Sequence, residues 1–139
     1  MTPSNRRSFL MLNYIVVMLG GALGTGARFW TSGIVAGRVG EFFPLGTLVV
    51  NVTGSFLIGF FAAFTDSEGP FLVPPRFRQF FTIGVCGGYT TFSSFSLQTL
   101  DLIRDGDWLK AFLNTLLSFV CCLAAVWVGR MLALTVLSK

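Results

Sequence analysis

The segment Gly84–Ser96, which reads GVCGGYTTFSSFS, constrains the fold of this chain more than any other. It lies inside a long apolar region, yet Gly87 and Gly88 are adjacent and Thr90 and Thr91 follow them. Glycine lowers helix stability by about 1 kcal/mol per site, and threonine adds a smaller penalty. In lipid, backbone groups released from a helix are costly unless something satisfies them. We therefore expect a helix that breaks or unwinds here, where it is buried in protein, lines a watery cavity or holds an ion.

Aromatic and hydroxyl side chains alternate just after the expected break. Phe92 and Phe95 are three residues apart and so share one helical face, and Ser93 and Ser96 repeat that spacing one residue along. Ordinary core packing is the alternative for the two rings, because the chain contains 16 Phe. The interleaved serines and the nearby break favour a functional pair.

Composition places the chain in a membrane. It is 53% hydrophobic and 12% charged, whereas soluble domains carry about 25% charged residues. Its 139 residues leave room for about four spans in one transmembrane domain, residues 1–139. The basic start of the chain is typical of a signal peptide, but the apolar run continues, which indicates a retained first helix. The fold class predicted from these features is an all-α integral membrane protein.

The predicted helices are separated by two polar connections and a charged turn. Ser32–Phe43 is expected to be a polar connection, and Thr65–Pro75 a loop with two acids and three prolines. A charged turn follows between Asp101 and Lys110. The helices are expected at about residues 9–31, 44–64, 76–102 (with the break near 84–91) and 108–134.

Several function classes find no support in the residues. The chain has no His, and Cys86, Cys121 and Cys122 lack the spacing of a metal site, so they are read as packing residues. The sequence offers no nucleophile–base pair, which argues against an enzyme. The net charge is +4, but the basic residues are dispersed, which favours membrane-flanking roles over nucleic-acid binding.

Polar residues inside the spans have two readings each. Thr47, Asn51 and Ser55 are four apart and share a helical face. Asn51 either hydrogen-bonds a neighbouring helix or turns its amide hydrogens to a pore, and the sequence leaves these even. For Arg28, a snorkelling interface arginine is slightly favoured over a charge at a channel mouth that attracts anions. Asn114, Ser118 and Cys122 are also spaced four apart.

The flanking charges are almost balanced. With the N-terminus inside, one side carries Arg6, Arg7, Arg76, Arg78, Arg130 and Lys139. The other side carries Arg28, Arg38, Arg104 and Lys110. The positive-inside rule gives no clear orientation for so small a bias, which is compatible with insertion either way up and with an antiparallel homodimer.

Three segments resemble one known family over nearly the whole chain, the Fluc/CrcB-type fluoride channels. They are GGALGTGARFW, PLGTLVVNVTGS and, most specifically, GGYTTFSSFSLQT. The resemblance implies subunits of four transmembrane helices in the inner (plasma) membrane, paired antiparallel as dual-topology dimers with two fluoride pores. The partners it implies are a second copy of the chain, fluoride and lipid.

The resemblance also assigns residues. The fluoride pore residues that it implies are Phe92, Phe95, Asn51, Ser93, Ser96, Thr47 and Ser118. Arg28 matches a vestibule arginine, and the backbone carbonyls of Gly87 and Thr90 match the site of a structural sodium ion shared by both subunits. Asn114, where an aromatic is usual, and Cys122, where a hydroxyl residue or glycine is usual, depart from the pattern and leave that end of the polar track open.

The function expected is passive, fluoride-selective export from the cytoplasm. All six acids fall in loops or at span ends, whereas proton-coupled transporters carry such residues in the membrane. A negative interior favours anion exit by about 2.3 kcal/mol per 100 mV. The alternatives are a small dual-topology multidrug or cation exporter, which needs an embedded glutamate, and a non-conducting membrane scaffold. Ring edges and hydroxyls do not by themselves exclude chloride, so selectivity for fluoride rests on the resemblance.

Overall fold

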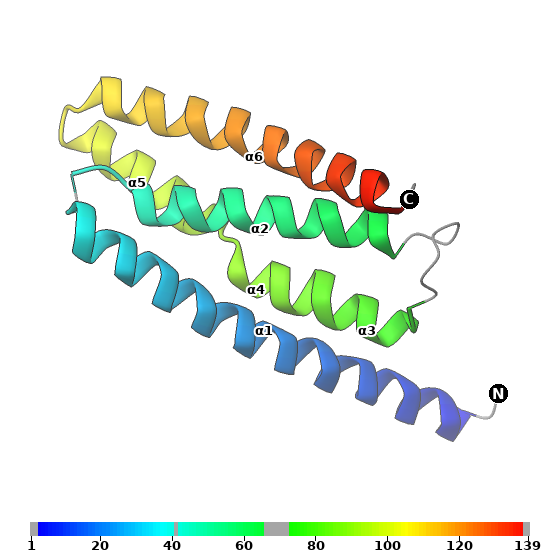
Figure 1. Ribbon diagram of the computed structural model, residues 1–139. Helices are drawn as coiled ribbons and strands as arrows, with labels where there is room; N and C mark the ends of the chain where they lie inside the picture. Colours follow the sequence, from blue (N-terminus) through cyan, green and yellow to red (C-terminus); the bar gives the residue numbers. More distant parts are fainter. Residues whose placement is uncertain (1–2, 41, 66–72, 138–139) are drawn as a thin grey trace.

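The computed structural model describes residues 3–40, 42–65 and 73–137, and every regular element in these ranges is helical (Figure 1). In chain order the elements are α1 (Pro3–Val39), α2 (Leu45–Phe64), α3 (Pro75–Gln79), the π-helical segment η1 (Phe80–Cys86), α4 (Gly87–Tyr89), α5 (Phe92–Arg104) and α6 (Trp108–Leu137). Three helical stretches are long and apolar enough to cross a membrane: Leu10–Val39, Leu45–Phe64 and Trp108–Leu137. Most of the predicted Thr65–Pro75 loop, together with Glu41 and Lys139, lies outside the described residues.

The first helix is longer than the sequence predicts. The polar connection expected from Ser32 onward is wrong, because α1 continues to Val39. The Ser32 hydroxyl donates to the backbone carbonyl one turn earlier, at 2.6 Å, so this polar residue is satisfied within the helix. The helix ends at Val39, and the next residue, Gly40, has φ +80° and an N–H that donates to the Ala36 carbonyl at 2.9 Å. Glycine adopts this left-handed conformation without a steric penalty, so it terminates helices well.

The third predicted span is interrupted, but after its glycine pair and not at it. Helical winding continues through Gly87 and Gly88, and only Thr90 and Thr91 are extended, with ψ of 157° and 113°. Figure 1 shows α3 and α4 as one rod that ends in a short extended link to α5. A Cβ on Gly88 would lie 2.5 Å from the carbonyl oxygen of Gly21, so glycine there serves the close approach of α1. Close packing therefore explains Gly88, and the threonines mark the break.

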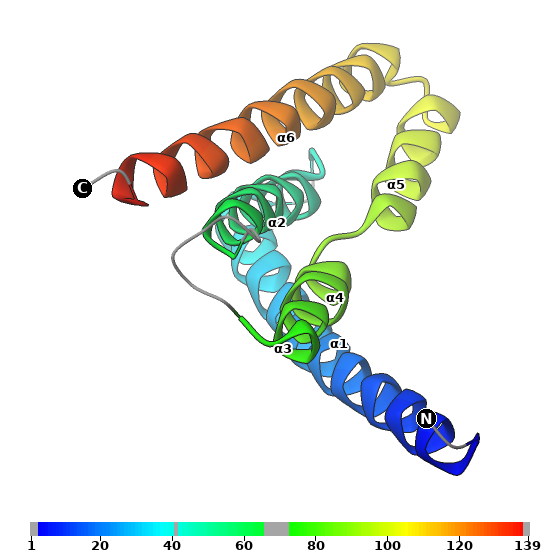
Figure 2. The same cartoon turned by 90° about the vertical axis from the view of Figure 1, so that its right-hand side faces the viewer.

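Glycines bring the helices together in two pairs. A Cβ on Gly24 would overlap the Val85 carbonyl oxygen, which places α1 directly against η1. A Cβ on Gly59 would overlap the Val126 carbonyl, which does the same for α2 and α6. Such backbone approach is typical of membrane helix packing, where small residues replace the large apolar core of soluble proteins. Figure 2 shows α5 set apart from α1, diverging from α6 beyond the turn that joins them.

Large apolar side chains cover the outside of the described chain. Trp30, Leu109, Phe119 and Trp127 expose between 63% and 70% of their surface. The buried apolar set consists of small or medium residues: Val50, Ala63, Cys86, Ala111 and Ala133. Exposed apolar surface on this scale requires lipid or another protein surface to cover it.

Candidate functional site

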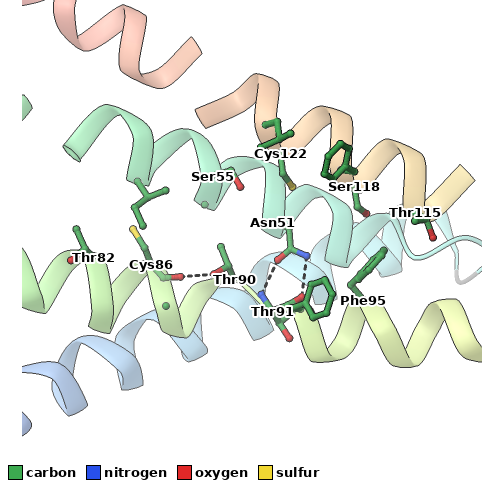
Figure 3. A pocket seen from close by; sticks show the side chains of 16 residues that line it. Asn51, Ser55, Thr82, Cys86, Thr90, Thr91, Phe95, Thr115, Ser118 and Cys122 are labelled. Carbon is green, nitrogen blue, oxygen red and sulfur yellow. Dashed lines mark hydrogen bonds between the residues drawn. The ribbon is translucent and has the colours of Figure 1, made fainter. Parts of the chain in front are cut away.

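A cavity of about 570 Å³ lies between α2, the interrupted segment and α6 (Figure 3). Six of the predicted site residues line it: Asn51, Gly87, Thr90, Phe92, Phe95 and Ser118. These residues come from three different parts of the sequence, so the helix packing brings them together. The cavity walls combine ring carbons with amide and hydroxyl groups.

The side chain of Asn51 holds the backbone of the break. The Thr91 N–H donates to Asn51 Oδ1 at 2.8 Å, and Asn51 Nδ2 donates to the Thr91 carbonyl at 3.0 Å (Figure 3). Since the backbone N–H can only donate, the amide has a single orientation that satisfies both bonds. Asn51 therefore acts as glue between helices, and one of its two Nδ2 hydrogens is not used by Thr91.

The Thr91 hydroxyl caps the first turn of α5. It accepts a hydrogen bond from the Ser94 N–H at 3.2 Å, and it lies 3.2 Å from the Ser93 hydroxyl. Threonine is a favoured N-cap residue, because its oxygen satisfies an amide that has no partner inside the helix. The partly positive N-terminus of α5 is thus placed beside the cavity, where it favours an anion.

The interruption releases backbone carbonyls that a continuous helix would occupy. The Thr91 N–H would donate to the Gly87 carbonyl in an unbroken helix, but it donates to Asn51 instead. The Thr90 carbonyl accepts a long hydrogen bond of 3.5 Å from Arg28 Nη1. Gly87 and Thr90 thus present oxygen acceptors near the break, of the kind that suits a hard cation.

Phe92 and Phe95 form a tilted aromatic pair at the start of α5. Their ring centroids are 5.4 Å apart and their planes make an angle of 46°. Phe95 is half-buried, whereas Phe92 is 79% exposed although it lines the cavity. One side of the cavity at Phe92 is therefore open in a single chain.

Four other predicted site residues lie away from this cavity. Thr47 lines two further cavities, of about 410 and 320 Å³, and Arg28 lines the smaller one. Ser93 and Ser96 line none of the three cavities, and the Ser96 hydroxyl donates to the Phe92 carbonyl at 2.9 Å. In the predicted hydroxyl stripe beside the rings, the Ser96 hydroxyl is thus already engaged in a hydrogen bond within α5.

Residues not assigned by the sequence also line the main cavity. Thr115 lies on the same face of α6 as Ser118, three residues away, and that spacing is the signal that identifies it. The Ser118 hydroxyl is buried and has no hydrogen-bond partner within the described part of the chain. Ser55, one turn after Asn51, lines the α2 wall. A buried hydroxyl without a partner is costly, so Ser118 is suited to donate to something that enters the cavity.

Comparison with known proteins gives one consistent result. The family model described as CrcB-like protein, Camphor Resistance (CrcB), matches residues 15–130. A Methylocella silvestris protein named "Fluoride-specific ion channel FluC" is 53% identical over 125 residues, which cover 90% of this chain and 95% of the relative. Proteins of the same name from Rhodospirillum rubrum and Opitutus terrae are 54% and 59% identical, over 86% of this chain and 92% and 91% of theirs.

Proposed function

The chain belongs to the CrcB family, and from this premise we propose that it is a passive, fluoride-selective ion channel of the cell inner membrane. Its relatives are named as fluoride-specific channels, which are not enzymes. It is a multi-pass membrane protein by its family and by its three long apolar helices. The family resemblance drawn from the sequence motifs is thereby confirmed.

One observation carries the proposal of an anion path: a single cavity is lined by two phenyl rings, an amide and a hydroxyl, and both polar groups have a hydrogen-bond donor that is not in use. The edge of a phenyl ring carries partial positive charge, which attracts an anion. The second Nδ2 hydrogen of Asn51 and the Ser118 hydroxyl offer true hydrogen bonds. Together they replace the water that a small, strongly hydrated anion must shed.

The path also has to let the ion leave. None of the groups around the cavity carries a full charge, so each holds an anion weakly, and conduction requires such weak sites. Thr47 and Arg28, at the neighbouring cavities, belong to the approach to this path in our proposal. Arg28 would attract anions electrostatically. Ser93 and Ser96 would complete the hydroxyl track when their hydroxyls exchange their present hydrogen-bond partners for the anion.

We propose further that two copies pair antiparallel and that each completes the other's path. The openness of the cavity at Phe92 and the exposed apolar faces support a protein partner there. The segment from Pro75 to Arg104, interrupted only at Thr90 and Thr91, would form a further crossing of the membrane in addition to the three apolar helices. The near balance of flanking charges supports insertion in both orientations.

A structural sodium ion fits the donors at the break in kind but not in number. The carbonyls of Gly87 and Thr90 are uncharged oxygen ligands. The Thr91 N–H, which would donate to the Gly87 carbonyl in a continuous helix, donates to Asn51 instead. Hard cations take several oxygen ligands, so two carbonyls from one chain are too few, and a symmetric second copy would raise the number of carbonyls to four. Arg28 bonds the Thr90 carbonyl only at 3.5 Å, a long distance that leaves this oxygen available. We therefore propose a sodium ion between the two copies, where it would add positive potential near the anion path.

The placement of the acidic residues outside the spans supports passive flow. The six acids of the chain lie at positions 41, 66, 68, 101, 105 and 107, in connections or at helix ends. A drug exporter driven by protons needs a carboxylate inside the membrane. With a negative cell interior, fluoride leaves without any coupled ion, which makes export the direction of net flow.

Ion flux through purified protein in liposomes tests the proposal. Liposomes loaded with potassium fluoride or potassium chloride are opened with a potassium ionophore, and external anion is recorded with ion-selective electrodes. We expect rapid fluoride efflux and little chloride efflux, with protein-free liposomes as the control. A scaffold would pass neither anion, an exporter would need an imposed proton gradient, and equal rates for the two anions would contradict selectivity.

A further inference from the structure

The helix that carries the aromatic pair has few attachments to the rest of the described chain. α5 is joined to α4 by the extended Thr90–Thr91 link and to α6 by a short turn around Gly106. Figure 2 shows α5 standing away from α1. Asn51 holds its first residues through Thr91, but this contact lies before the rings of Phe92 and Phe95. Something further along the helix must fix its distance from α6.

A buried amide on α6 makes that contact. Asn114 is 2% exposed and its Nδ2 donates to Thr99 Oγ1 on α5, at 2.9 Å. The Thr99 hydroxyl in turn donates to the Phe95 carbonyl, at 2.7 Å. A chain of two hydrogen bonds therefore runs from α6 to the backbone of Phe95, and the bonds of such a chain polarise and strengthen one another.

The position of Asn114 on α6 links this contact to the cavity. It precedes Ser118 by one helical turn and adjoins Thr115, and both of those residues line the cavity opposite the rings. Asn114 itself does not line the cavity. Among the described residues, this is the side-chain hydrogen bond that connects α5 with α6.

We propose that Asn114 is a positioning residue, which sets the spacing between Phe95 on α5 and the hydroxyls of α6 through Thr99. The inference rests on the proposed channel function, because the spacing matters only if an ion passes between these walls. Asn114 does not contact the ion. It fixes the width of the path, and a wider path lets the anion keep more of its water and discriminates less between fluoride and chloride.

The test compares four variants with the wild-type protein in the liposome assay. Asn114→Leu and Thr99→Val remove the two partners with little change of size, a double variant combines them, and Thr99→Ser keeps the hydroxyl as a matched control. We expect each of the first two to lower the ratio of fluoride to chloride efflux by about 3- to 20-fold, the range that a membrane hydrogen bond of this kind supports. The double variant should lower this ratio no more than either single variant does, and the ratio for Thr99→Ser should stay close to that of the wild type.

The outcomes separate this inference from the function on which it rests. If the wild type passes no fluoride, the channel function fails and the inference with it. If the wild type conducts selectively and the losses of the two single variants add, or neither variant changes the ratio, Asn114 is not a positioning residue and the channel function stands. If Asn114→Leu does not fold, Thr99→Val against Thr99→Ser still decides, because only the former should change the ratio.

Discussion

The backbone of Thr91 is held by the side-chain amide of Asn51 through two hydrogen bonds, of 2.8 and 3.0 Å, across 40 residues of sequence. A broken helix leaves donors and acceptors that lipid cannot satisfy. Asn51 accepts from the N–H and donates to the carbonyl of the same residue, and an uncharged amide carries both the acceptor and the donor that these two bonds need. The same side chain lines the cavity, so the interruption and the proposed anion path share one residue.

Replacement of Asn51 by Asp should therefore stop fluoride flow almost completely. A carboxylate can accept from the Thr91 N–H but cannot donate to the Thr91 carbonyl, and its negative charge repels an anion. A lost donor to a buried carbonyl alone costs about 1–3 kcal/mol, which corresponds to about 5- to 160-fold, and the repulsion of the anion adds to this, so we expect efflux to fall by at least about tenfold. The measurement is fluoride efflux from liposomes. Leu57→Val on α2 is the control and should keep its rate, because Leu57 is 43% exposed and lines none of the described cavities. An Asn51→Asp protein as fast as wild type would place Asn51 outside the path.

Replacement of either ring by an aliphatic side chain should slow fluoride without unfolding the protein. Phe92→Ile and Phe95→Ile keep apolar bulk but remove the positive ring edges that line the cavity. Aromatic contacts of this kind contribute about 0.5–1.5 kcal/mol, so each variant should lose about two- to tenfold in efflux. Phe112→Ile, on the outer face of α6, serves as the control because Phe112 is 61% exposed and lines none of the described cavities. Equal losses in all three variants would mean that the effect is not one of pore chemistry.

The close contact of α1 with the π-helical segment should make Gly24 intolerant of any side chain. The Cβ of Gly24→Ala would overlap the backbone carbonyl of Val85, which cannot move aside as a flexible side chain does. Overpacking of this kind costs about 1–3 kcal/mol, so the melting temperature in detergent should fall clearly. Gly26→Ala on the same helix meets nothing within 4 Å and should melt like wild type or slightly higher. If the two variants melted alike, α1 would not pack against the segment in this register.

Removal of sodium should lower the stability of the protein if a sodium ion joins two copies at the carbonyls of Gly87 and Thr90. A ligand present at 100 times its Kd stabilises the folded state by about 2.7 kcal/mol. We expect a lower melting temperature and slower fluoride efflux when sodium is replaced by N-methyl-D-glucamine at constant ionic strength, and recovery when sodium is returned. Replacement of sodium chloride by sodium gluconate is the control, since it leaves the cation unchanged. Identical melting and flux with and without sodium would remove the ion from the proposal.

The even distribution of basic residues predicts both orientations in one membrane. A tag placed after Lys139 should be reached by an impermeant label from both faces of the cell membrane, in comparable amounts. Added arginines at one end should bias the labelling to one face and reduce activity, which a second plasmid with the opposite bias should restore. Labelling from a single face in the unaltered chain would exclude the antiparallel pair.

The sequence by itself determined the class of this protein and the place of its irregularity. Composition and the length of the apolar runs identify an all-helical membrane chain, because these properties depend only on which residues must leave water. The motif GGYTTFSSFSLQT pointed to the family that the comparisons show. It also located the interruption within a few residues, since glycine and threonine weaken a helix wherever they occur.

Only the tertiary structure decided what each of those residues does. The helix is interrupted at Thr90 and Thr91, and the preceding Gly88 is helical and packs closely against α1, a contact that no local propensity predicts. Asn51 and Asn114 each left open readings in the sequence, and each is held by a partner in a distant segment: Thr91 in the extended link and Thr99 on α5. Local preferences act between neighbours along the chain, whereas a buried hydrogen bond is satisfied by whatever group the packing of distant segments places within about 3 Å.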